Sequence, residues 1–310
     1  MNVLVTGGCG YIGSALVPLL QQSPEIENIV ILDNYSLGSP RNLMGANLDD
    51  SIDFRRGDVR EYGDVESAMR DVQTVIHLAA ITGADSTHDR REETFDVNLE
   101  GTKNVLTAAR KLDVENVVFA SSCNNYGRAT SMDLTEDTPT DPLNPYAESK
   151  QAAEELLRDT IDESGMQGVA LRMSTNYGYA PGVRFNLVVN HFVFRALTRR
   201  PLTVYGDGSN WRPFIHVKDA ARAYAHAALN PDDWDEFVYN VGSNDQNFRI
   251  AEIAQVVSEE VGEVNITYLE DKHPGPSYHV NFDRLANTGF RTEWTLREGV
   301  RELADHFRQP

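Results

Sequence analysis

Cysteine, lysine and long apolar runs are all scarce in this 310-residue chain, and each shortage excludes a class of protein. Cys9 and Cys123 are the only cysteines, and they form neither a CxxC pair nor a metal-binding pattern, so we expect no metal and no disulfide. No run reaches the roughly 18 apolar residues of a membrane span. The first apolar run begins at Val3, which leaves no room for a signal peptide, and a cytoplasmic protein is expected.

Positive charge is also in short supply. Five lysines and 23 arginines face 47 acidic residues, giving a formal net charge of -19. Nucleic acid is therefore disfavoured as a partner, because a phosphate backbone needs clustered Lys and Arg. An anionic substrate would have to meet a local group of cations inside an acidic protein. Hydrophobic residues make up 41% of the chain, which allows one large α/β unit or two closely joined domains with a full core.

Glycine, by contrast, is concentrated near the N-terminus in the stretch TGGCGYIG at 6–13. An apolar run precedes it and an apolar helical pattern follows, which is the strand–turn–helix context of a dinucleotide-binding turn. Asp33 closes a second buried run about 20 residues further on, where a carboxylate can accept hydrogen bonds from the adenosine ribose. We therefore predict a bound dinucleotide. Asp33 favours NAD over NADP, because a carboxylate would repel a 2′-phosphate.

Strand-like and helix-like patterns alternate along the chain. Strands are predicted at 3–5, 29–32, 74–78, 117–120 and 169–172. Helices are predicted at 12–22, 61–70, 92–112, 146–163, 186–198, 216–229 and 249–261. This alternation predicts an α/β fold with a Rossmann-type, doubly wound parallel sheet. We expect an NAD-binding domain over 1–175 and a smaller, irregular substrate-binding lobe over 176–310, some of whose elements return to the sheet.

Tyr146 and Lys150 lie four residues apart in a helical pattern and so share one helix face. The lysine charge favours phenolate, so we expect the pKa of Tyr146 to lie below its ordinary value of about 10. Such a phenol can act as general acid or base toward a substrate hydroxyl or carbonyl. Ser121 and Ser122 follow the fourth predicted strand, and one of their hydroxyls can hydrogen-bond the reacting oxygen. Each motif is common alone; their order along the chain is informative.

With these motifs the chain resembles the extended short-chain dehydrogenase/reductase superfamily, in its nucleotide-sugar epimerase/dehydratase branch. The matching stretches are TGGCGYIG, LDN, GDVRE, VIHLAA, DVNLEGT, SSCNNYG, NPYAESK, LTVYGDGSNWRPFIHVKDAA and YNVGS. The resemblance implies NAD as cofactor, and the residues it places around NAD are Gly7, Gly10, Tyr11, Ile12, Gly13, Asp33, Asn34, Asp58, Val59, Leu78, Ala79, Ala80, Asn98, Tyr146 and Lys150. It also implies a catalytic set in which Ser122 orients the substrate oxygen, Tyr146 is the acid/base, and Lys150 binds the nicotinamide ribose.

For the substrate, the resemblance implies contacts from Ser122, Cys123, Asn124, Thr175, Asn186, Tyr205 and Arg212. Arg212 would bind the nucleotide diphosphate, and Arg184 is a further candidate for an anion. The family's second diphosphate arginine is absent near the Pro-Gly at 274–275, and His273 or Arg284 are its candidate substitutes.

Two further departures bear on the reaction. Thr175 stands where epimerases often carry Asn, which leaves the sugar open. Cys123 and Asn124 occupy the positions of the acidic pair in dehydratases, so dehydration is disfavoured.

The resemblance thus implies a nucleotide-sugar 4-epimerase of the UDP-glucose/UDP-galactose type, with a UDP-sugar as the substrate. A net oxidoreductase, a decarboxylase or an epimerase acting at another carbon remain open. A non-catalytic dinucleotide sensor is less favoured, because such relatives typically lose the Tyr/Lys pair. The resemblance also implies a homodimer, formed through the helices at 92–112 and 146–163. Neither nucleic acid nor a membrane is expected as a partner.

Overall fold

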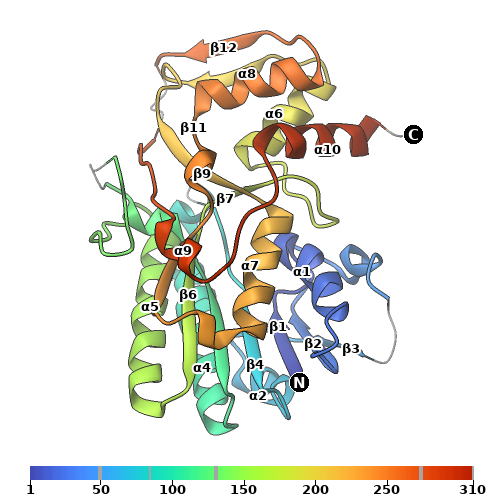
Figure 1. The fold of residues 1–310 in the computed structure, drawn as a ribbon, viewed down its shortest axis with the longest axis vertical. Coiled ribbons are helices and arrows are strands. Elements are labelled where there is room, and N and C mark those ends of the chain that lie inside the picture. The colour runs from blue at the N-terminus through green and yellow to red at the C-terminus, as the bar shows by residue number, and fades with distance from the viewer. Residues whose placement is uncertain (48–50, 84, 129–131, 272–274, 309–310) are drawn as a thin grey trace.

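The computed structural model describes all residues except 48–50, 84, 129–131, 272–274 and 309–310. A seven-stranded sheet, in which every neighbouring pair of strands is parallel, forms its larger part (Figure 1). The spatial order is β10-β6-β5-β4-β1-β2-β3. The strands are β1 (Asn2–Thr6), β2 (Asn28–Asp33), β3 (Ile52–Arg56), β4 (Thr74–His77), β5 (Asn116–Ser122), β6 (Gln167–Met173) and β10 (Val238–Val241).

The strand order reverses beside β1, which lies between β2 and β4. A crevice at such a reversal, outside the carboxyl ends of the strands, is where open α/β sheets bind their ligands. The predicted dinucleotide turn follows β1 directly, so the topology places it at this crevice. The predicted Rossmann-type fold is confirmed.

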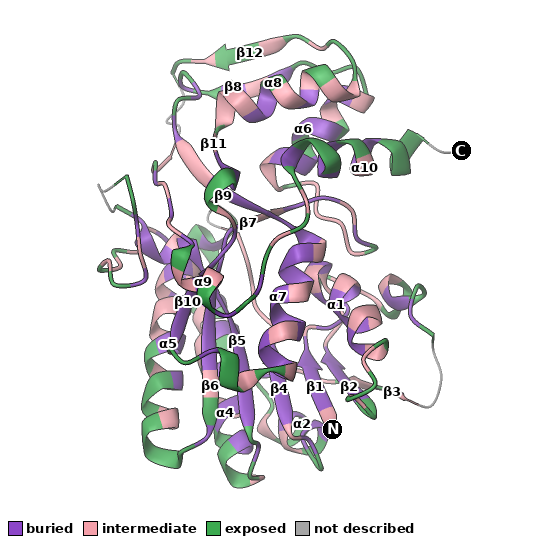
Figure 2. Cartoon of the chain, in the orientation of Figure 1, coloured by how far each residue is buried: buried purple, intermediate pink, exposed green. Residues whose placement is uncertain are grey.

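Helices cover both faces of the sheet, and this is why its strands read as continuous apolar runs. In β1, Val3 and Val5 face α1 (Tyr11–Gln21) and α7 (Val217–Leu229), while Leu4 faces the opposite core. All three side chains are fully buried, and Figure 2 shows that the central strands of the sheet are largely buried as well. The helices on the second face are α2 (Tyr62–Ala68), α4 (Gly101–Lys111) and α5 (Pro145–Ser164).

The helix predicted over 92–112 is interrupted. It consists of α3 (Arg91–Phe95), a π-helical turn at Asp96–Glu100, and α4. The π turn contains Asn98, which is fully buried and uses its side-chain amide outside the helix. π turns of this kind are common at functional sites. The hydrophobic periodicity does not reveal the extra residue, because the helical pattern resumes after it.

A smaller lobe packs beyond the carboxyl end of the sheet (Figure 1). It holds two small sheets and three helices that share one apolar core. The strands are β7 (Thr175–Tyr177), β9 (Trp211–His216) and β11 (Asn247–Arg249) in one sheet, and β8 (Leu202–Tyr205) and β12 (Ile266–Leu269) in the other. The helices are α6 (Val188–Leu197), α8 (Ile250–Val261) and α10 (Leu296–Arg308), and a short α9 (Asp283–Asn287) lies nearer the main sheet.

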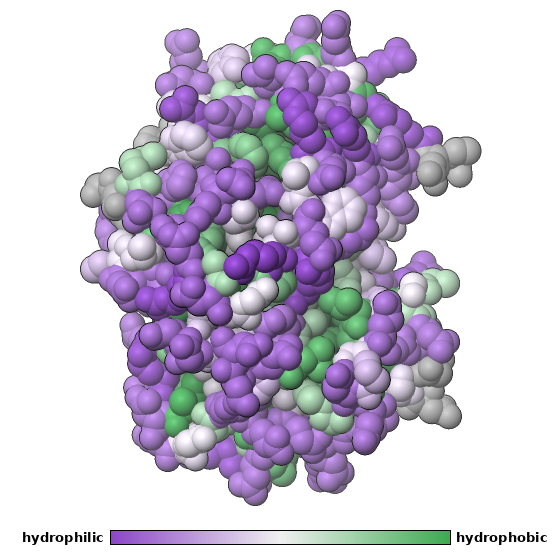
Figure 3. Space-filling view, viewed as in Figure 1, coloured by the Kyte–Doolittle hydropathy of each residue, from purple (hydrophilic) through white to green (hydrophobic). Residues whose placement is uncertain are grey.

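Hydrophilic side chains cover most of the face seen in Figure 3, as the acidic composition requires. Among the described residues, no helix combines the length and apolar character needed to cross a membrane.

Candidate active site

The glycine turn after β1 leaves no room for side chains. Gly7 has a φ of 71°, and a Cβ there would lie 2.8 Å from the backbone nitrogen of Ala79, at the end of β4. A Cβ at Gly13 would lie 2.4 Å from the carbonyl oxygen of Gly8. Helix α1 begins immediately after Gly10 with no acidic residue in its first turn, so its N–H groups are open to an anion. The bare turn therefore fits a pyrophosphate.

Asp33, at the carboxyl end of β2, holds this turn in place. Its Oδ2 accepts the backbone N–H of Cys9 at 3.0 Å, and its Oδ1 accepts that of Tyr35 at 2.8 Å. Burial raises the pKa of the Asp33 carboxyl, and the two N–H groups partly offset this. Each carboxylate oxygen retains a second lone pair, so the group can also accept bonds from ribose hydroxyls.

Asp58 and Asn34 lie together on the adenosine side of the predicted site. Asn34 donates to Oδ2 of Asp58 at 2.9 Å, and Arg60 binds the same carboxylate through two of its nitrogens. These bonds, first of all that from Arg60, hold the pKa of Asp58 well below its usual range. Arg60 was not predicted as part of the site, although an arginine two residues after Asp58 in the sequence indicates that the two side chains can pair. Val59 beside them is buried.

The segment after β4, Leu78 to Ala80, is fixed by its backbone. The N–H of Leu78 donates to the carbonyl of Thr6, and that of Ala79 to the Thr6 hydroxyl. Asn98 bonds both the N–H and the carbonyl of Ile81, and donates to the Ser149 hydroxyl on α5. Asn98 therefore ties the predicted dinucleotide path to the helix that carries Tyr146 and Lys150.

Helix α5 starts one residue before Tyr146, because Asn144 caps it and Pro145 occupies its first position. The Tyr146 phenol lies near the Ser122 hydroxyl, at the end of β5, and this hydroxyl lowers the pKa of the phenol. The Ser122 oxygen accepts two N–H bonds from Asn124, both 3.2 Å long, so its own proton is free to point at the phenol oxygen. The structure thus brings Ser122 and Tyr146 together.

The expected low pKa of Tyr146 is contradicted by this geometry. Burial raises the pKa of the phenol, and Lys150 is not among the charges that oppose the rise. The opposing groups are the Ser122 hydroxyl and the guanidinium of Arg184. The sequence argument considered Lys150 alone and neglected the desolvation of the phenol, which is the larger effect here.

Lys150 is itself buried, with 2% of its surface exposed. Burial lowers the pKa of its ammonium to about 7, and the charge of Glu154 partly offsets this. Its nitrogen lies 4.8 Å from the centre of the Phe119 ring, and it forms no ion pair within the described part of the chain. A buried ammonium without a bonded partner fits a cofactor hydroxyl, as predicted for the nicotinamide ribose.

Arg184 joins the site from the segment that follows β7, at the border of the smaller lobe. Its guanidinium donates to the Thr82 hydroxyl, just after the dinucleotide segment, and its charge acts on both Tyr146 and Tyr11. Burial lowers the pKa of Arg184, and none of the described carboxylates pairs with it. Tyr11 donates to the carbonyl of Gly178 at 2.6 Å, which ties the glycine turn to the same segment of the lobe.

Of the predicted substrate residues, Arg212 is placed as expected for an anion site. Its guanidinium packs 4.7 Å over the Tyr278 ring, burial lowers its pKa, and no described carboxylate pairs with it. Thr175 is half-buried in β7, and Asn186 is exposed and contacts Arg184. Tyr205 is 53% exposed at the end of β8.

Two of the substrate predictions need correction. The side chain of Cys123 turns into a small apolar cluster, where its Sγ lies 3.1 Å from the carbonyl oxygen of Arg172, so it does not face the site. Arg284 does not replace the missing diphosphate arginine, because Glu136 and Asp137 already bind it. His273, the other candidate, lies outside the described residues.

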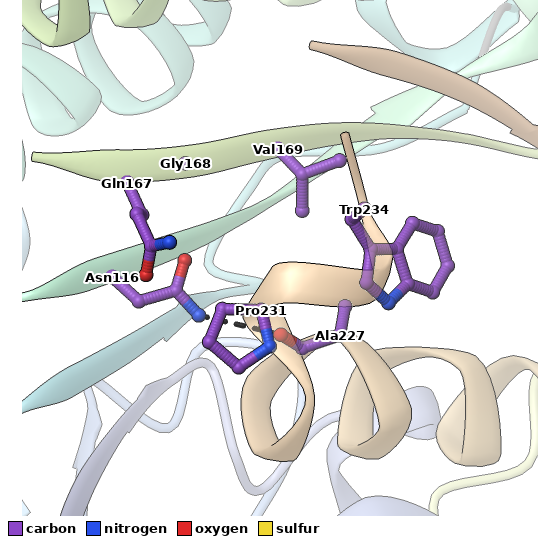
Figure 4. Close-up of a pocket in the computed structure, with 7 residues that line it drawn as sticks. All are labelled: Asn116, Gln167, Gly168, Val169, Ala227, Pro231 and Trp234. Atoms are coloured by element: carbon purple, nitrogen blue, oxygen red, sulfur yellow. Dashed lines mark hydrogen bonds between the residues drawn. The ribbon is translucent and has the colours of Figure 1, made fainter. Parts of the chain in front are cut away.

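A small, partly open cavity of about 80 Å³ lies elsewhere (Figure 4). Asn116, Gln167 and Val169 line it together with residues near the end of α7, so it opens at the amino ends of β5 and β6. Ligands of α/β sheets bind at the opposite edge, and this cavity is too small for a nucleotide. In the described part of the chain no cluster of His, Cys, Asp or Glu could hold a metal ion.

Comparison with known proteins gives long matches among nucleotide-sugar enzymes. The chain is 30% identical to a putative UDP-glucose 4-epimerase of Methanocaldococcus jannaschii, over 98% of this chain and 97% of that protein. It is 30% identical to the low-salt glycan biosynthesis protein Agl12 of Haloferax volcanii, over 99% and 98%. It is also 30% identical to a dTDP-glucose 4,6-dehydratase of an Actinoplanes species, over 99% and 98%.

Solved structures of similar fold also include nucleotide-sugar epimerases. A UDP-N-acetylglucosamine 4-epimerase of Methanobrevibacter ruminantium, in complex with UDP-N-acetylmuramic acid, has a TM-score of 0.89 at 27% identity, covering 99% of this chain and 98% of the other. The Thermus thermophilus UDP-glucose 4-epimerase, in complex with NAD, has a TM-score of 0.84 at 31% identity, covering 100% and 99%.

The family model described as the NAD dependent epimerase/dehydratase family matches residues 3–242. NAD as the predicted cofactor is thereby confirmed. With the bare glycine turn, Asp33 and the Ser122–Tyr146 pair all at one crevice, the match agrees with the geometry. The chain belongs to the NAD-dependent epimerase/dehydratase family.

Proposed function

We propose that this protein is a 4-epimerase of a UDP-linked sugar that works through a transient 4-keto sugar. The observation that carries the proposal is the proximity of Ser122 and Tyr146, with Lys150 on the next helical turn, at the edge of the sheet where the glycine turn lies. Relatives and similar structures that are named for 4-epimerases of UDP-sugars support the choice of reaction and nucleotide.

In this mechanism Tyr146 takes the proton of the C4 hydroxyl as the C4–H bond breaks. NAD, held by the glycine turn and Asp33, would supply a reversible hydride acceptor at C4. Ser122 donates a hydrogen bond to the reacting oxygen and keeps it beside Tyr146. Arg184 favours the ionised phenol through its positive charge. The keto sugar turns and receives hydride on its other face, and Tyr146 returns the proton, so no net oxidation occurs.

Arg212 is the residue proposed to hold the diphosphate. A guanidinium binds phosphate through two parallel hydrogen bonds, and the half-buried position of Arg212 reduces competition from water. Asp33 and the glycine turn are proposed to bind NAD, and Lys150 its nicotinamide ribose.

Dehydration is the second candidate, since a dTDP-glucose 4,6-dehydratase is among the relatives. Removing water from the sugar needs an acid beside the leaving hydroxyl. Asn124 occupies one of the two positions concerned, and its amide is bound to Ser122 and to the Tyr278 hydroxyl. Cys123 occupies the other and faces away. These contacts favour epimerisation.

The test is to incubate the protein with UDP-, dTDP-, GDP- and CDP-sugars and a trace of NAD, and to identify the products by NMR. We expect the C4 epimer of a UDP-sugar, no loss of water and no accumulation of NADH. Tyr146→Phe should abolish the reaction. Tyr224→Phe is the matched control, because the buried Tyr224 hydroxyl has no hydrogen-bond partner among the described residues. A 4-keto-6-deoxy product, or full activity of Tyr146→Phe, would overturn the proposal.

A further inference from the structure

Helix α5 carries a third ionisable residue in line with Tyr146 and Lys150. Glu154 follows Lys150 by four residues, so the three side chains lie one turn apart on a single face. Glu154 is only 5% exposed. Carboxylates are rarely buried to this extent unless they are paired. The mechanism proposed above does not use Glu154.

The Glu154 carboxylate is held from three sides. Its Oε1 accepts bonds from the Ser121 hydroxyl, from the Asn125 amide at 3.1 Å and from Arg172 Nε at 3.1 Å. Its Oε2 accepts Arg172 Nη2 at 2.9 Å. Ser121 immediately precedes Ser122 in β5, so the carboxylate links the end of that strand to the catalytic helix. Its position is therefore fixed.

Apart from Glu154, few charged groups surround Lys150. His77 approaches from β4, but it bonds to Thr6 and Thr102, and burial lowers its pKa to about 3, so it stays neutral. The Phe119 ring faces Lys150 from β5. Arg172, on β6, forms an ion pair with the Glu154 carboxylate. Within the described part of the chain, Glu154 is the carboxylate whose charge acts on the Lys150 ammonium.

We propose that Glu154 is a positioning residue of the active site, whose carboxylate keeps the buried Lys150 ammonium charged and fixes the strand end that carries Ser122. Lys150 can bind the nicotinamide ribose as a cation only while it stays protonated, and burial works against this. Glu154 opposes that loss without touching substrate. The inference rests on the proposed function for its consequence in catalysis, but the charge of Lys150 can be measured without any sugar.

The chain's shortage of lysine makes this measurement practical. Only five lysines are present, so enrichment of their ε-carbons with ¹³C gives few NMR signals, and Lys150→Arg identifies the one from Lys150. In the NAD-bound protein we expect the Lys150 signal to titrate well below the others. In Glu154→Gln the midpoint of the Lys150 titration should fall further, by about one pH unit. The alkaline limb of the activity profile should move the same way.

Two variants separate charge from structure. Glu154→Asp keeps the charge and disturbs the packing, so the Lys150 midpoint should stay near that of the wild type. Glu136→Gln removes another buried carboxylate, which bonds the Asn240 N–H and is not among the groups that act on Lys150, so it should leave the midpoint unchanged. An unchanged midpoint in Glu154→Gln, or equal shifts in Glu154→Gln and Glu136→Gln, would overturn the proposal.

Glu154→Gln leaves Arg172 as a buried cation without its partner, which can prevent folding. If Glu154→Gln does not fold, the double variant Glu154→Gln/Arg172→Met tests the proposal instead, because it removes both charges together. Since the charge of Glu154 acts on Lys150 and that of Arg172 is not among its causes, the midpoint should still fall, though by less. A midpoint equal to that of the wild type in the double variant would refute the role. Absence of epimerase activity with every sugar would refute the proposed function alone.

Discussion

Replacing Lys150 with Met should inactivate the enzyme and yet stabilise the protein. Lys150 is 2% exposed and sits over the Phe119 ring without a bonded counter-ion in the described structure. Its pKa falls from 10.5 to about 7 on burial, so the folded state holds the ammonium at a cost. At about 1.4 kcal/mol per pH unit, that cost is about 5 kcal/mol below pH 7.

Replacing Lys150 removes this cost, but two smaller effects destabilise the variant. The contact between the ammonium and the Phe119 ring contributes about 1 kcal/mol, and methionine packs imperfectly at about the same cost. A net stabilisation of about 3 kcal/mol remains for the NAD-free protein at pH 6. Between pH 7 and 10.5 the folded state has already released the proton that the unfolded state still holds, so wild-type stability rises toward that of the variant. At about 1.4 kcal/mol per pH unit, the difference of about 3 kcal/mol should vanish about 2 pH units above pH 7, and wild type should be the more stable protein by pH 10.5.

The assay is urea unfolding of wild type and Lys150→Met at several pH values, with and without NAD. NAD should stabilise the wild type more than the variant, because the variant lacks the proposed ribose ligand. A variant that is less stable than wild type at pH 6, with the same dependence on pH from 7 to 10.5, would refute the reasoning.

Three further outcomes are expected. His77→Gln should reduce the loss of stability on acidification. The pKa of His77 in the folded protein, about 3, lies below the ordinary 6.5, so wild-type stability falls as pH drops below 6.5, by at most about 1.4 kcal/mol per pH unit. Equal slopes of unfolding free energy against pH for the two proteins, measured by urea unfolding, would contradict this. Gly13→Ala should weaken NAD binding by calorimetry at least about tenfold, since its Cβ would meet the Gly8 carbonyl at 2.4 Å. Arg184→Gln should lower kcat at neutral pH and restore part of it at higher pH, because the pKa of Tyr146 rises further; an unchanged pH profile would count against that role.

Five strands of the main sheet were predictable because they are buried on both faces, whereas β3 was missed because only Ile52 of its five residues is buried. Continuous apolar runs such as those of β1 and β5 have no competing interpretation, and each was extended by one or two residues at most at each end in the structure. β10 was missed because Asn240 interrupts its short run, although that side chain is fully buried and bonded to the carbonyls of Leu134 and Asn281. The strands of the smaller lobe have three to six residues, too few for a period to appear.

The site was predictable where a motif is local in the chain. The glycine turn, Asp33 and the Tyr146–Lys150 pair each derive from neighbouring residues. The placement of Arg184 beside Tyr146 was not predictable, because it depends on a contact with Thr82 across about 100 residues of chain. The pKa of Tyr146 was mispredicted for the same reason: its burial is a property of the folded lobes, and periodicity carries no information about it.

The basic residues give an independent argument for the location of the site. Wherever the pKa of a described arginine is raised, as at Arg60, Arg172 and Arg284, a carboxylate binds it. The described lysines and arginines whose pKa is lowered are Lys150, Arg184 and Arg212, and all three belong to the proposed site. An acidic protein has carboxylates enough to neutralise them, so leaving three buried cations unpaired is a cost that a ligand must offset. A dinucleotide and a nucleotide diphosphate are anions of the right kind, and their binding should relieve that cost.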